Sequence, residues 1–143
     1  MLVPEEVNSY EVRLNGWDET VTAKPATFDE LTPLIEKGMR EGLSFIDKTR
    51  YYGIWHKDHI LGFCGLVLYG KRAIFKNDYV LEEWRGNRLW DILFTHRLNV
   101  CRALKTVQYI EADANAKSHP NYLRMGCHTV APYKAGGKVR MYL

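Results

Sequence analysis

The sequence of 143 residues is long enough for one domain and too short for a tandem array, a solenoid or a large two-domain enzyme. Apolar residues make up 46% and aromatic residues 13% of the chain, which excludes an intrinsically disordered protein. The net charge of +3 is uneven: 7 basic and 11 acidic residues lie in 1–70, but 13 basic and 6 acidic residues lie in 71–143. A basic second half suits a phosphate-bearing ligand or nucleic acid, although a solvated basic surface is the simpler explanation.

The three cysteines, Cys64, Cys101 and Cys127, stand in apolar surroundings without Cys-x-x-Cys spacing. We therefore expect reduced, buried thiols and a cytoplasmic protein. Neither the cysteines nor the histidines form a set of three or four ligands, so no metal is predicted. The first ten residues carry two acids and no apolar segment, which does not fit a signal peptide, and the apolar stretch at 60–69 is too short to span a bilayer. No membrane partner is expected.

The first half of the chain predicts one amphipathic helix among short strands. Leu31, Leu34 and Ile35 share a helical face, and Thr27 stands where an N-cap is expected. Short turns at 57–58 and 70–72 predict a three-strand antiparallel meander. In chain order we expect strands over 10–14 and 20–23, a helix over 28–38, a weaker helical segment over 42–48, and strands over 51–56, 59–69 and 73–80.

The second half predicts the strongest helix, over 88–104, because apolar residues follow two neighbouring stripes along it. A strand over 106–112 and a short helix over 115–125, closed by Gly126, come next. Strands over 128–133 and 138–143 then flank a glycine-rich hairpin turn. Because a helix is the usual connection between parallel strands, strands 73–80 and 106–112 are expected to pair in parallel. The fold class is therefore α/β (α+β), with helices packed on a mixed sheet.

Four segments follow one another in this order: VTAKPATFDELTPLI, HILGFCGLVL, YVLEEWRGNRLWDIL and IEADANAKSHPNYLRMGC. From about residue 21 to the end of the chain, they resemble the GNAT superfamily of acyl-CoA-dependent N-acyltransferases. The last is similar to the family's fifth strand and fourth helix, with its pattern of spaced residues at Asn115, Ser118, Tyr122 and Gly126. The resemblance implies a single GNAT-like domain over 1–143, in which residues 1–19 add a strand or arm. It also implies a mostly antiparallel sheet with a parallel pair at the cofactor cleft and about four flanking helices.

The sequence departs from the family at the pyrophosphate loop. The family pattern is Q/R-x-x-G-x-G/A, but the segment here is Arg85-Gly86-Asn87-Arg88-Leu89-Trp90, so both later small positions are lost. In this motif backbone N–H groups at a helix N-terminus bind the pyrophosphate. Trp90 either crowds the cofactor or turns inward as core. The resemblance implies that acetyl-CoA or another acyl-CoA is bound by Val80, Arg85, Gly86, Asn87, Arg88, Leu89, Trp90 and Asn115.

The resemblance also assigns the chemistry. The backbone N–H near Val80 would bind the thioester carbonyl, where the fourth and fifth strands of the family splay apart. Tyr122 would protonate the departing thiolate; otherwise its ring packs on the sheet and its hydroxyl bonds locally. Asn115 would bond the pantetheine arm, although capping the helix is at least as good an explanation.

A carboxylate is the expected general base. Glu111, near the end of the predicted strand, is the candidate, with Asp113 and Asp78 as rivals and a water chain as a further option. Alternation puts Glu111 and Asp113 on the same face of the strand.

Two functions remain open at this point. The first is an N-acetyltransferase that passes an acetyl or short acyl group to a primary amine of a small molecule or peptide by direct attack in a ternary complex. The second is an inactive GNAT-like fold that serves as a structural part of an assembly such as a virion. The basic terminal hairpin favours solvated surface over a nucleic-acid contact, and the resemblance leaves a homodimer open.

Overall fold

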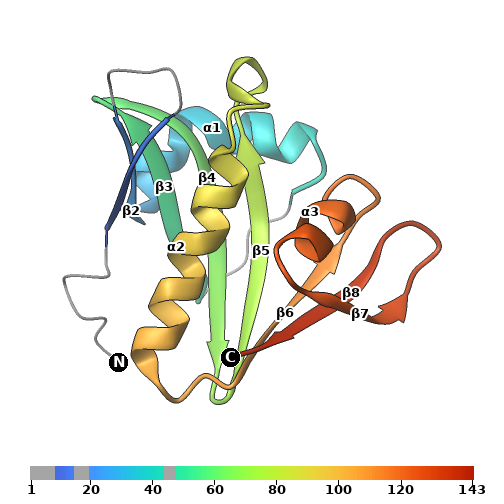
Figure 1. Cartoon of the computed structure of the whole chain (residues 1–143). Helices are drawn as coiled ribbons and strands as arrows, with labels where there is room; N and C mark the ends of the chain where they lie inside the picture. Colours follow the sequence, from blue (N-terminus) through green and yellow to red (C-terminus); the bar gives the residue numbers. More distant parts are fainter. Residues whose placement is uncertain (1–8, 15–19, 44–47) are drawn as a thin grey trace.

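A computed structural model describes residues 9–14, 20–43 and 48–143 (Figure 1). Eight strands form one sheet in the order β1-β2-β3-β4-β5-β6-β8-β7. The elements in chain order are β1 (Tyr10–Arg13), β2 (Thr20–Ala26), α1 (Phe28–Arg40), β3 (Arg50–His56), β4 (His59–Tyr69), β5 (Arg72–Val80), the 3₁₀ turn η2 (Glu82–Trp84), α2 (Leu89–Leu104), β6 (Tyr109–Ala114), α3 (His119–Arg124), β7 (His128–Pro132) and β8 (Gly137–Tyr142).

The sheet is antiparallel except between β5 and β6, which confirms the mixed fold and the predicted parallel contact. This parallel pairing is short, running from Arg72 beside Tyr109 to Ile74 beside Glu111. Beyond it β5 continues to Val80, whereas β6 turns away with β8 and β7, as Figure 1 shows. The two strands therefore diverge toward the end of the sheet at which α2 begins.

The helices cover opposite faces of the sheet, with α2 in front of the strands and α1 behind them in Figure 1. On the α2 side, Leu93, Phe94 and Val100 belong to the larger buried core. On the α1 side, Leu31 and Leu34 pack with Phe63 and Tyr79 in a smaller buried cluster. Burial of these apolar faces is the main force that holds the helices on the sheet.

The start of α1 follows the sequence prediction closely. The hydroxyl of Thr27 accepts a bond from the backbone N–H of Glu30 at 3.1 Å, and the Glu30 carboxylate accepts one from the N–H of Thr27 at 3.0 Å. This reciprocal capping box satisfies two N–H groups that the helix leaves without partners.

Several predicted boundaries were wrong. The described residues hold three α-helices, and most of the segment expected to be helical over 42–48 lies outside them. The strand expected over 106–112 is β6, at 109–114, because α2 ends at Leu104, the next residue, Lys105, is left-handed, and the chain must turn before it pairs. The helix expected over 115–125 begins only at His119, because the Asn115 side chain holds a turn ahead of it.

No described helix is long and apolar enough to cross a membrane.

Candidate active site

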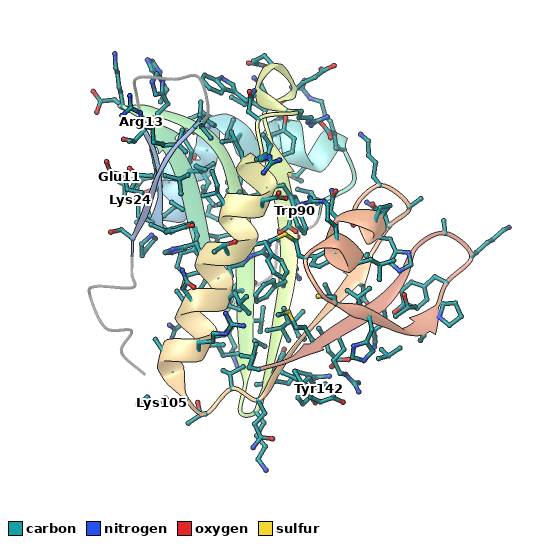
Figure 2. The ribbon with its side chains drawn as sticks, in the orientation of Figure 1. Glu11, Arg13, Lys24, Trp90, Lys105 and Tyr142 are labelled. Carbon is teal, nitrogen blue, oxygen red and sulfur yellow. The ribbon has the colours of Figure 1, made fainter. Side chains whose placement is uncertain are left out.

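A cleft of about 890 Å³ occupies the space where β5 and β6 diverge. Its walls come from the end of β5, the loop before α2, the first turn of α2, the start of the segment after β6, and α3. The size is in the range of small-molecule sites. In Figure 2 the side chain of Trp90 lies between α2 and α3, which marks the position of the cleft.

The backbone of Val80 opens into this cleft. Leu81 N donates to Leu61 O at 2.8 Å, so Val80 and its partner Gly62 form the next, non-hydrogen-bonded pair of the antiparallel ladder. The N–H and C=O of Val80 consequently point away from β4, on the side where β6 has already departed. Gly62 is required opposite Val80, because a Cβ there would lie 2.5 Å from the carbonyl oxygen of Tyr79.

The first turn of α2 also lines the cleft. Arg88 precedes the helix with a φ of 63°, Gly86 has a φ of 86°, and no side chain caps the helix. An uncapped helix start exposes backbone N–H groups and the positive end of the helix dipole. The predicted loop residues 86–90 therefore form a backbone surface that suits an anion, even though the two small family positions are lost.

The two arginines of this loop have different roles. Arg85 Nε donates to Val80 O at 2.8 Å, and Arg85 Nη2 donates to both carboxylate oxygens of Glu41 at 2.9 and 2.8 Å. Arg85 thus ties the loop to the C-terminal end of α1. Arg88 is exposed at the cleft, and its side chain has no hydrogen bond or ion pair with any described residue. Asn87 is a structural residue of the loop, since its Nδ2 donates to Trp84 O at 3.1 Å.

Trp90 is both a cleft wall and part of the packing. Its ring stacks on Phe94 with centroids 5.5 Å apart and meets Tyr122 edge-on at 4.9 Å. The indole is only partly buried and lines the cleft. The large ring is accommodated because it packs against Phe94 of α2 and Tyr122 of α3. It forms one side of the cleft beside Tyr122.

Tyr122 lies at the floor of the cleft and is 3% exposed. Its hydroxyl donates to Asp78 Oδ2 at 2.9 Å. Asp78 Oδ1 in turn lies 2.7 Å from Nη1 of the fully buried Arg97. Burial and the neighbouring Asp78 carboxylate raise the pKa of Tyr122 well above its ordinary value of 10.

Asn115 lines the cleft, but its side-chain oxygen is already engaged. Oδ1 accepts bonds from the backbone N–H groups of Lys117 at 2.9 Å and Ser118 at 2.8 Å. The Ser118 hydroxyl accepts one from Asn115 N at 3.2 Å. Of the two predicted roles, the structure contains the capping of the turn before α3.

The predicted carboxylates are distributed differently from the expectation. Glu111 is not among the residues that line the cleft; its carboxylate is 3.0 Å from Arg140 Nη2 and 3.5 Å from Arg72 Nη1. Asp113 lines the cleft and accepts a 2.6 Å bond from the hydroxyl of Tyr133. Of the three candidates, only Asp78 contacts Tyr122, because β6 parts from β5 directly after Glu111.

Comparison with solved structures identifies this architecture. The GNAT domain of PAT from S. lividans superposes with a TM-score of 0.75 at 12% identity, over 98% of this chain and 99% of that one. An acetyltransferase of the GNAT family from Staphylococcus aureus gives 0.71 at 13% identity, over 86% and 99% of the two chains. The chain has the GNAT fold. N-acetylglutamate synthase from Neisseria gonorrhoeae, solved with coenzyme A and L-arginine, gives 0.68 at 14% identity over 86% of this chain and 33% of that one. No protein-family model and no curated protein sequence matches the chain.

Sequence reasoning missed Arg97, which is fully buried beneath the cleft and pairs with the cleft residue Asp78. The signal was present: position 97 falls on the same helical face as Leu93, Val100 and Leu104, so a charged residue interrupts an apolar stripe. A charge on a buried stripe requires a buried partner, here Asp78. Among the residues that the structure describes, no three His, Cys, Asp or Glu side chains are close enough to hold a metal ion.

Proposed function

We propose that this protein transfers an acetyl or other short acyl group from acyl-CoA to a primary amine, in the cytoplasm. The observation that carries the proposal is the convergence of three features on one cleft: the outward-facing amide of Val80, the uncapped first turn of α2, and the hydroxyl of Tyr122. These features correspond to a carbonyl site, a pyrophosphate site and a proton donor. The GNAT fold of the chain supports the same assignment.

The residues present fit acyl-CoA. The N–H groups at the start of α2 and the unpaired guanidinium of Arg88 would hold the pyrophosphate, since an arginine forms charge-assisted bonds to phosphate oxygens. Arg85 contributes indirectly by fixing the loop and the carbonyl of Val80. Asn115 shapes the opposite side of the cleft and keeps its amide nitrogen available to the pantetheine arm.

The chemistry would proceed by direct attack. Val80 N–H donates to the thioester oxygen as negative charge develops there, the new C–N bond forms, and the C–S bond breaks. Tyr122 would give the proton that the leaving sulfur requires, and its oxygen would take the proton that the nitrogen loses. Glu111 stays outside this scheme, because two arginines hold its carboxylate away from the cleft.

Calorimetry with acetyl-CoA and CoA tests the binding half of the proposal, with CoA release from acetyl-CoA in the presence of small primary amines and peptides as the second measurement. Tyr122→Phe removes one hydroxyl and keeps the ring, so turnover is expected to fall by roughly 10²–10⁴-fold with little change in acyl-CoA affinity. Absence of acyl-CoA binding at about millimolar concentration (a free energy of about −4 kcal/mol) would refute the proposal and favour the structural-component alternative.

A further inference from the structure

A largely buried polar cluster lies at the floor of the cleft and is formed by residues from four elements. Arg97 of α2 is fully buried; its Nη1 is 2.7 Å from Asp78 Oδ1 of β5 and donates to Gly65 O of β4 at 3.1 Å. Its guanidinium also lies 4.2 Å from the ring centroid of Phe75. On the other side, Asp78 Oδ2 accepts the hydroxyl bond of Tyr122 from α3. The cluster therefore connects the buried side of α2 to Tyr122 at the floor of the cleft.

The energetics of the cluster do not favour a purely stabilising role. A buried ion pair loses as much hydration free energy as it gains from attraction, and well-packed apolar residues are often equally stable in its place. Here Arg97 Nη2 is also buried without an acceptor among the described residues, which adds an unmet hydrogen bond. A role in specifying the position of a neighbour explains the cluster better. Asp78 and Tyr122 both line the cleft, and Tyr122 is the neighbour whose hydroxyl bonds to Asp78.

We propose that Asp78, held in place by Arg97, is a positioning residue for Tyr122 and fixes the direction of the Tyr122 hydroxyl proton. A tyrosine hydroxyl has one proton, and here that proton is donated to Asp78. The lone pairs of the oxygen are then left to accept a bond from the cleft. This inference rests on the proposed acyl transfer, since it concerns how the proton of that reaction moves.

The contact with Asp78 constrains the proton transfer. Burial and the carboxylate raise the pKa of Tyr122 well above 10, so a tyrosinate beside Asp78 is strongly disfavoured. The lone pair that faces the cleft takes the proton that the attacking nitrogen loses, and in the same step the original hydroxyl proton leaves its bond with Asp78 and turns to the sulfur. The C–N bond forms, the C–S bond breaks, one proton passes from nitrogen to oxygen and one from oxygen to sulfur, and Tyr122 ends neutral.

The first test is a double-mutant cycle on turnover. Asp78→Asn is expected to lower kcat by about tenfold or more and to leave the KM for acetyl-CoA nearly unchanged, because the hydroxyl is misdirected while the cofactor contacts remain. Added to Tyr122→Phe, the same change is expected to have no further effect, since Asp78 acts through the hydroxyl that is already absent. Multiplicative losses in the double variant would overturn the proposal.

A second variant guards against loss of folding, because Asp78→Asn alone leaves the Arg97 charge buried without a partner. Asp78→Asn combined with Arg97→Met removes both charges and is expected to recover the thermal midpoint while kcat stays as low as in Asp78→Asn. If kcat recovers together with the thermal midpoint in this double variant, Asp78 has only a structural role and the proposal is overturned. Glu36→Gln removes an exposed ion pair with Arg40 on α1 and is the matched control. It should change neither kcat nor the thermal midpoint.

A measurement without turnover separates this inference from the proposed function. In protein labelled with ¹³C at tyrosine Cζ, the Tyr122 resonance is assigned by its loss in Tyr122→Phe. It is expected to shift in Asp78→Asn and in the double-charge variant but not in Glu36→Gln. An unmoved resonance in Asp78→Asn refutes the positioning contact. If no amine is acylated but the resonance moves, the proposed function fails and the contact stands.

Discussion

The helices α1 and α2 lie on opposite faces of one sheet, and they differ in how they begin and in what they bury. The first turn of α1 is closed by the Thr27–Glu30 capping box, and its ion pair between Glu36 and Arg40 is exposed. The first turn of α2 is uncapped and opens into the cleft, and its middle buries His96 and Arg97. The hydrogen bonds at the start of α1 are satisfied within the helix, whereas the first turn of α2 leaves its N–H groups open to the candidate site.

The largest expected difference between the helices concerns their arginines. Arg97→Met leaves the Asp78 carboxylate without its buried counterion, and the free energy of unfolding should fall by about 3–5 kcal/mol. Arg40→Met breaks an exposed pair and should cost about 0–1 kcal/mol. Urea unfolding of the two variants checks this. Equal losses would mean that the buried pair is no more important to folding than a surface one.

The pH dependence of stability should come partly from His96 of α2. Burial, with a smaller contribution from Arg97, lowers the pKa of His96 to about 4, whereas an unfolded histidine titrates near 6.5. Between these values the unfolded chain binds the proton and the folded chain does not, so stability is present above pH 6.5 and is lost as the pH falls toward 4. The loss is about 3 kcal/mol.

Thermal midpoints from pH 7 to 4.5 test this effect. His96→Phe keeps an aromatic ring against Tyr52, whose centroid lies 4.9 Å from that of His96, and removes the titrating group. The decline of the midpoint with falling pH should be shallower in this variant than in the natural chain. Parallel declines would contradict the assignment to His96.

The open start of α2 should matter for ligand binding and not for folding. Arg88→Gly removes the guanidinium and suits the left-handed backbone, so acyl-CoA affinity should fall by about 1–3 kcal/mol without loss of stability. Calorimetry measures the affinity. Arg102→Gln, at the far end of the same helix, changes the net charge equally and should leave affinity unchanged. A similar loss in both variants would point to general charge rather than to the helix start.

The smallest effect is expected at the closed start of α1. Thr27→Ala removes the cap and should lower the free energy of unfolding by about 1 kcal/mol, while Thr27→Ser retains the hydroxyl and most of the stability. Thermal unfolding measures both. Acyl-CoA affinity should be the same in the two variants, and a fall in affinity would remove the distinction between the two helix starts.

Much of the fold could be predicted because its signals are local. Thr27 caps α1 as expected, the apolar stripes of α2 mark its length within a residue, and the meander from β3 to β5 follows its short turns. The parallel contact of β5 and β6 followed from the helix that connects them. The boundaries that failed, at β6 and α3, depended on how the left-handed Lys105 and the Asn115 side chain redirect the chain.

The candidate site was only partly predictable. The spacing of Asn115, Tyr122 and the loop before α2 pointed to segments that line one cleft. The side-chain partners could not be foreseen: Arg85 bonds Glu41, 44 residues away, and Tyr122 bonds Asp78 at the same separation. Alternation put Glu111 and Asp113 on one face but gave no information on where β6 leaves β5.

The sequence by itself determined the order of helices and strands, the capped start of α1 and the segments that form the cleft, because periodicity, capping and turn chemistry act over a few neighbouring residues. Only the tertiary structure decided that Arg97 compensates Asp78, that Asp78 accepts the hydrogen bond of the Tyr122 hydroxyl, and that Glu111 is turned away toward Arg72 and Arg140. Hydrogen bonds and ion pairs require atoms to meet within about 3 Å, and that accuracy arises only when distant elements pack together.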